Sequence, residues 1–163
     1  MRLLRHLFAR SARHLFPEDR LHRIADAIAA GELRHRGEIL FAVESELPAV
    51  MVLRGVQARA RAEAAFARLR AWDTEANNGV LIYLLLADHR IEIVADRGLA
   101  GRVSAEQWRG VCLLIEERMR AGEPEQAVVQ GIEAVSALLA THFPQGDGRP
   151  DLDELPNLPL ILD

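Results

Sequence analysis

Apolar residues form two continuous runs in this chain, and elsewhere they recur mainly at helical spacing. The first run is Glu38–Glu44, and the second is Val80–Leu86, which is apolar at every position. Short runs of this kind are typical of strands that are covered on both faces. Between them, Gln57–Trp72 is rich in alanine and arginine and places its apolar residues on one helical face. The pattern predicts a strand–helix–strand crossover, which sets the two strands parallel.

A hairpin is predicted at the second run. Asn78–Ala87 is followed by a tight turn at Asp88 and His89, and Arg90–Ala95 then returns as an antiparallel partner strand. The turn lacks the Asn-Gly or Asp-Gly pair that two-residue hairpins favour, so its type stays open.

Helices are predicted on both sides of these strands. Pro17 opens one helix before the first strand, because proline suits the first helical turn. Ser104 and Gln107 form a capping box that begins a second helix, and Pro124 begins a third. The predicted fold class is therefore α/β: an α/β/α sandwich with a small mixed sheet and a C-terminal helix pair.

Charge divides the chain into three parts. Residues 1–16 form a basic amphipathic segment with four arginines, residues 17–143 form the α/β domain, and residues 144–163 form an acidic, proline-rich extended tail. We expect the last part to dock through its apolar end.

Composition excludes several classes of function. All 20 basic residues are arginine, so no lysine is present for Schiff-base chemistry or a phosphate loop. The pI of about 5.9 argues against a general nucleic-acid binder. Cys112 is the one cysteine, which rules out an internal disulfide. No signal-peptide core and no apolar run of membrane-spanning length is found, so we expect a cytoplasmic location.

Three segments around the hairpin resemble one known family. Asn78–Ile82, Asp88–Ile93 and Arg97–Leu99 are similar to the core of the TPM domain, a family named after a plant thylakoid lumen protein, a photosystem II repair protein and a nematode receptor-associated protein. The resemblance covers about Leu21 to Phe143, and the chain looks like the short soluble branch of the family. It implies an α/β/α sandwich, a phosphatase activity and divalent-metal binding, most often of calcium.

The chain departs from the family pattern after the hairpin. Asp96-Arg97 stands where a glycine and an aromatic residue are usual, and the residues after Leu99 differ from the usual acidic-then-threonine form.

The carboxyl ends of the two predicted parallel strands are the first candidate site. Glu44, Glu46 and Asp88, with Ser45 and His89, are expected at this edge of the sheet, where open α/β sheets place ligands. Carboxylates gathered there suit Ca²⁺ or Mg²⁺, which would orient a phosphate and activate a water. The alternative is that these residues are solvated strand ends.

The opposite edge of the sheet is the alternative metal site. Asp73 and Asn78 precede the second strand and Asp96 follows the third, so the ends of the hairpin bring Asp96 near Asn78. The competing interpretation is that these side chains cap loops as Asx turns. The sequence does not choose between the two edges.

Two further candidates carry weaker signals. Arg97 and Arg102 flank a glycine-containing turn and are candidates for anion binding, or are plain surface arginines. Cys112 lies on an apolar stripe, which favours a core residue over a nucleophile. There is no sequence signal for a nucleotide or haem.

The basic segment 1–16 has three possible roles. It packs on the domain, binds a protein partner, or lies on an anionic membrane surface through its leucines, phenylalanine and arginines. With no serine-centred elbow in the sequence, we expect a binding or accessory domain that acts with an unidentified protein partner. A metal-dependent phosphatase and a peripheral membrane protein are the alternatives.

Overall fold

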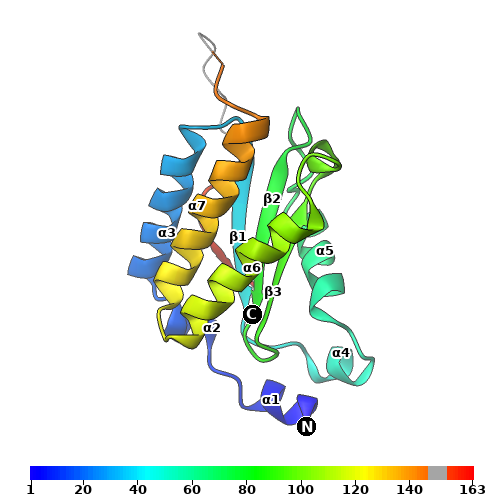
Figure 1. Ribbon diagram of the computed structural model, residues 1–163. Coiled ribbons are helices and arrows are strands. Elements are labelled where there is room, and N and C mark those ends of the chain that lie inside the picture. The colour runs from blue at the N-terminus through cyan, green and yellow to red at the C-terminus, as the bar shows by residue number, and fades with distance from the viewer. Residues whose placement is uncertain (147–153) are drawn as a thin grey trace.

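The computed structural model describes residues 1–146 and 154–163 and shows a sheet with helices on both faces (Figure 1). The helices of these residues are α1 (Arg2–Leu7), α2 (Ala12–Leu15), α3 (Glu18–Glu32), α4 (Ala49–Leu53), α5 (Ala58–Arg68), α6 (Ala105–Arg120) and α7 (Pro124–His142), with a short 3-10 helix, η1 (Arg97–Leu99). The strands are β1 (Glu38–Glu44), β2 (Gly79–Leu85), β3 (Arg90–Ala95) and β4 (Leu160–Ile161).

The sheet has the order β3-β2-β1-β4 and is mixed. β1 and β2 are parallel, with Glu38 beside Gly79, and β2 and β3 form the antiparallel hairpin. Every residue of β1 and β2 is buried, as the unbroken apolar runs predict. The predicted crossover, hairpin, sandwich and C-terminal helix pair are therefore confirmed.

Two apolar cores form because successive side chains of a strand point to opposite faces. On one face, Ile39 and Ile82 pack against α2, α3, α6 and α7. On the other face, Leu40 and Leu81 pack against α4 and α5. The alanines of α5 bring that helix close to the sheet.

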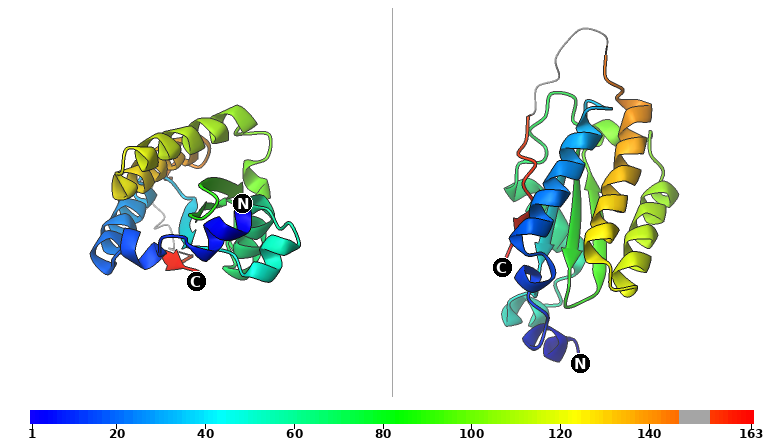
Figure 2. Two further views of the ribbon diagram at one scale, coloured as in Figure 1. Left: turned by 90° about the horizontal axis from the view of Figure 1, so that it is seen from below. Right: turned by 90° about the vertical axis from the view of Figure 1, so that its left-hand side faces the viewer.

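Three local features differ from the sequence-based expectation or were not anticipated. The helix expected over Gln57–Trp72 ends at Arg68, and Arg70 follows with a φ of 57°. The short helix α4 was not predicted. The C-terminal segment pairs with β1 as strand β4, and Figure 2 shows it running beside the sheet. The predicted docking of the apolar tail end thus occurs on the chain's own sheet.

The hairpin turn is longer than predicted: β2 ends at Leu85 rather than Ala87, and residues 86–89 form a four-residue turn in place of the expected Asp88–His89 pair. His89 completes the turn in a left-handed conformation, with a φ of 50°. The predicted capping box of α6 is present, with the Ser104 and Gln107 side chains each accepting from the other residue's backbone N–H. No helix of the described residues combines the length and apolarity needed to cross a bilayer.

Candidate functional site

The carboxyl ends of β1 and β2 hold two carboxylates that are tied to cationic side chains. Glu44 is buried and accepts a bidentate bond from Arg61 of α5, with Nη2 2.8 Å from Oε1 and Nε 2.9 Å from Oε2. The Tyr83 hydroxyl donates to Glu44 Oε2 at 2.5 Å. Burial and the neighbouring carboxylate raise the pKa of Tyr83, and the bonds to Glu44 raise the pKa of Arg61. The three groups therefore form a buried hydrogen-bonded cluster in which Glu44 accepts from both Arg61 and Tyr83.

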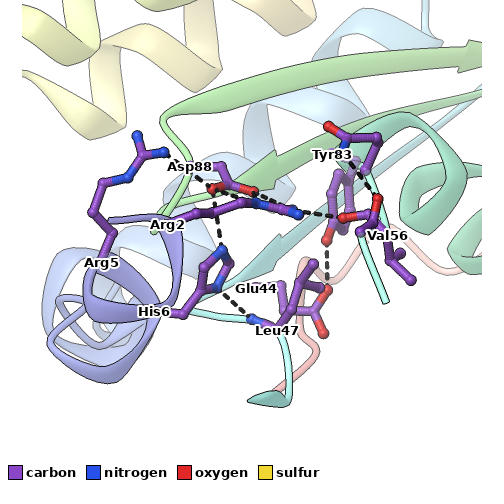
Figure 3. Close-up of polar contacts among 10 residues, drawn as sticks. Arg2, Arg5, His6, Glu44, Leu47, Val56, Tyr83 and Asp88 are labelled. Atoms are coloured by element: carbon purple, nitrogen blue, oxygen red, sulfur yellow. Dashed lines mark hydrogen bonds and ion pairs between the residues drawn. The ribbon is translucent and has the colours of Figure 1, made fainter. Parts of the chain in front are cut away.

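The second carboxylate, Asp88, binds helix α1 (Figure 3). Arg2 donates Nη2 to Asp88 Oδ2 at 2.7 Å and also donates to the carbonyl of Val56. His6 Nδ1 accepts from Leu47 N–H, so its Nε2 carries the proton that is donated to Asp88 Oδ1 at 3.1 Å. Burial raises the pKa of Asp88, but the bonds from Arg2 and His6 outweigh it and hold that pKa below its usual value. The strand-end acid thus anchors the N-terminal helix.

Ser45 joins both ends of the chain to the same edge. Its hydroxyl donates to Asp163 at 2.6 Å and accepts from the backbone N–H of Ala12 at 2.7 Å. Its own N–H donates to the other oxygen of the Asp163 carboxylate. Ser45 therefore ties α2 and the C-terminal residue to this edge of the sheet.

The structure brings together part of the first predicted site. Glu44 and Asp88 lie at the same edge, whereas Glu46 and His89 are exposed beside it. Within the described ranges, no three His, Cys, Asp or Glu side chains are grouped to hold a metal. The oxygens of Glu44 and Asp88 already accept from Arg61, Arg2 and His6, and these donors do not fit a site for Ca²⁺ or Mg²⁺.

The partners of these acids escaped the sequence reasoning. The acids are bound by Arg2 and His6 of α1 and by Arg61 of α5, which lie well away from the strand ends along the chain. Asp163, equally distant, binds Ser45. A possible signal was the arginine-rich composition of 1–16 set against the acids that end β1 and β2.

The opposite edge contains the second predicted set. Asp96 N–H donates to Gly79 O at 2.9 Å, so the ends of the hairpin meet as expected. Asn78 is buried and donates Nδ2 to Arg36 O, and Asp96 Oδ1 accepts from the backbone N–H of Arg97. Asp73 is exposed and pairs with Arg70. The Asn78 Oδ1 and Asp96 Oδ2 atoms are buried and have no hydrogen-bond partner among the described residues.

The remaining predicted residues, Arg97, Arg102 and Cys112, have unrelated surroundings. Arg102 donates to the carbonyl of His142 and lies over the ring of Phe143, 4.9 Å from its centre, while Arg97 is exposed. Cys112 is half-buried against the core, and burial raises the pKa of its thiol to about 11. At neutral pH that thiol is protonated.

Helices α1 and α4 together expose a group of large apolar side chains. They lie side by side at the end of the molecule below the sheet (Figures 1 and 2). The α1–α4 surface, as it is called below, consists of side chains that are each more than half exposed: Leu4, Leu7, Phe8, Val50 and Leu53. Single exposed leucines are ordinary, but exposed apolar side chains on two neighbouring helices make this end of the molecule a candidate interaction surface.

The architecture and the edge clusters define a small α/β domain with helices on both faces of a mixed sheet. The model of the TPM domain family matches residues 10–138, which is most of the chain, and the protein belongs to that family. The NMR structure of the BA42 protein from the psychrophilic bacterium Bizionia argentinensis is similar, with a TM-score of 0.76 and 31% identity over 88% of this chain and 92% of that chain. No curated protein matches the chain.

Proposed function

We propose that this TPM domain is a binding or accessory domain that acts with a protein partner through the α1–α4 surface. The observation that carries the proposal is the exposure of five large apolar side chains on two adjacent helices. The apolar face of α1 points outward because Arg2 and His6, on its other face, are tied to Asp88. The strand-end acid thereby serves binding by fixing the helix that presents the apolar residues.

A metal-dependent phosphatase is less well supported by the same edge. Such an enzyme needs carboxylates that are free to coordinate a metal and a position for an attacking water. Glu44 and Asp88 accept hydrogen bonds from arginine and histidine side chains. The Ser45 hydroxyl donates to Asp163 and accepts from the backbone N–H of Ala12. These contacts favour the binding function.

Crosslinking in the producing cell tests the partner. A photo-crosslinking amino acid placed at position 8 is expected to give a discrete protein adduct on irradiation, and the adduct is expected to disappear in a Leu7→Glu, Leu53→Glu variant. The same amino acid at position 68, on the exposed side of α5, is the control and is expected to give none. Absence of any adduct from position 8 would overturn the proposal.

An anionic membrane is the competing occupant of the same surface. Arg5 and Arg54 border the apolar residues and are exposed, as in helices that bind lipid headgroups. Sedimentation with vesicles containing phosphatidylglycerol separates the two cases. Binding that is lost in the Leu7→Glu, Leu53→Glu variant, together with lipid but no protein adducts, would assign the surface to a membrane instead.

A second candidate function is divalent-cation binding at the Asn78–Asp96 edge. The specific observation in its favour is the pair of buried oxygens, Asn78 Oδ1 and Asp96 Oδ2, that have no hydrogen-bond partner within residues 1–146 and 154–163. Oxygen ligands suit Ca²⁺ and Mg²⁺, and an unsatisfied buried oxygen in a native protein calls for an ion or a water.

A calcium titration followed by thermal unfolding tests the cation. We expect Ca²⁺ to raise the Tm of the unmodified protein and of an Asp73→Asn control, whose side chain is exposed, and to have no effect on Asp96→Asn. An equal rise in all three proteins, or no rise in any, would remove this candidate.

A further inference from the structure

In the part of the chain that the structure describes, strand β3 leaves one edge of the sheet without a neighbouring strand. It pairs with β2 on one side, and in the sheet order it is terminal. The bond from Asp96 N to Gly79 O shows that alternate residues, Glu92 and Val94 among them, direct their backbone groups toward β2. The residues between them, Ile91, Ile93 and Ala95, therefore direct N–H and C=O groups outward. The bond from Arg59 Nη1 to Ile93 O at 2.7 Å, made from outside the sheet, agrees with this.

A groove of about 730 Å³ runs along this open edge. Its floor is β3, and α5 and α6 stand on either side of it (Figure 1). Arg59 lines the α5 side, and Trp108, Cys112 and Leu113 line the α6 side. Leu113 is more than half exposed. The groove therefore combines outward-facing backbone groups, of which the Ile93 carbonyl accepts from the Arg59 side chain, with an apolar wall. These are the two elements that a strand-adding peptide uses.

The charged side chains that line the groove indicate the charge of the ligand that it binds. Both acids in its lining are paired within the chain: Glu92 lies 3.9 Å from Arg59, and Glu116 accepts from Arg120. Arg90 and Arg109 also line the groove, and the structure gives neither an acidic partner in the described residues. The unbalanced charge is positive, so an acidic segment is the complementary ligand.

We propose that the groove binds an extended, acidic peptide segment of a partner protein, which adds to β3 as a further strand. The chain already uses this mode on the opposite edge of its sheet, where Leu160–Ile161 pairs with β1. The inference deepens the proposed function, since it requires a protein partner, but it concerns a surface separate from α1 and α4.

Selection from a random library of displayed seven-residue peptides, with the full chain as bait, tests the proposal. Acidic peptides are expected to be enriched, and their binding is expected to weaken at least tenfold in an Arg90→Glu, Arg109→Glu variant. An Arg13→Glu, Arg68→Glu variant reverses two exposed arginines outside the groove and is expected to bind as the unmodified chain does. Two peptides are then compared, each methylated on one of the two alternate sets of backbone nitrogens. The peptide methylated on the N–H groups that face β3 is expected not to bind, because strand addition needs those groups.

Each other outcome overturns the proposal. No enrichment of acidic peptides, binding that survives the Arg90 and Arg109 reversals, or binding that survives methylation whichever alternate set of nitrogens carries it would each refute strand addition. A dimer that the same reversals dissociate would assign the edge to a second copy of this chain instead. The Leu7→Glu, Leu53→Glu variant is expected to keep full peptide affinity, so a failure of the α1–α4 surface is seen separately from a failure here.

Discussion

Replacing Asp88 by asparagine removes the anchor of α1 while preserving the size of the side chain. The carboxylate accepts three bonds from Arg2 within 3.2 Å and one from His6. Asparagine keeps one oxygen and sets an amide donor against the donors of Arg2. The substitution therefore removes the negative charge and leaves part of the donors of Arg2 and His6 without an acceptor.

The expected cost follows from burial. The side chains of Asp88, Arg2 and His6 are 9%, 23% and 2% exposed. Removing one partner of a fully buried pair costs about 3–5 kcal/mol. Arg2 and His6 belong to a short N-terminal helix, however, and release of α1 returns both to water. The loss is therefore limited to what docking of α1 contributes, and we expect the free energy of unfolding to fall by about 2 kcal/mol.

Urea unfolding followed by circular dichroism measures the global change, and hydrogen exchange with mass spectrometry measures α1 directly. We expect amides of residues 4–8 to exchange much faster in Asp88→Asn, and the α1–α4 surface to lose its partner with them. The pH dependence has a defined sign. Because its partners lower the pKa of Asp88 below 3.8, its contribution is complete above that pH and is lost as the pH falls through the lowered value.

Glu46→Gln is the matched control, because Glu46 lies at the same edge and is exposed. The reasoning is refuted if Asp88→Asn changes the free energy of unfolding by no more than about 0.5 kcal/mol, the range typical of surface substitutions, and leaves exchange in α1 as it was.

Three further predictions concern the body of the domain. Glu44→Gln should lower the free energy of unfolding by about 3 kcal/mol in urea, because it breaks a buried ion pair; a loss below about 1 kcal/mol would contradict the cluster's buried charge. Gly79→Ala should lower the Tm severely, since a Cβ there would lie 1.9 Å from the carbonyl oxygen of Ala71. Gly110→Ala is the control: it changes an open helical position and should raise the free energy of unfolding by about 0.5–1 kcal/mol. Burial lowers the pKa of His35 to about 4, while the unfolded chain takes up the proton near 6.5, so stability should fall by about 3 kcal/mol between pH 7 and 4. A His35→Gln variant should lose that slope, and an unchanged slope would exclude His35 as its source.

The local pattern was sufficient for most of the fold. Unbroken apolar runs predicted β1 and β2, and the capping box of Ser104 and Gln107 predicted the beginning of α6. These signals are short-range, because burial of a strand and capping of a helix are recorded in neighbouring residues. The same reasoning placed Glu44 and Asp88 at one edge of the sheet, since parallel strands end together.

Tertiary structure decided what those acids do. Asp88 is bound by Arg2, 86 positions away, and Ser45 by Asp163, 118 positions away. The local sequence around a charged side chain at a strand end does not differ between one that coordinates a metal, one that faces water and one that binds an arginine. Its role depends on which distant segment packs against it, and that is fixed by three-dimensional packing of the whole chain rather than by its neighbours in sequence.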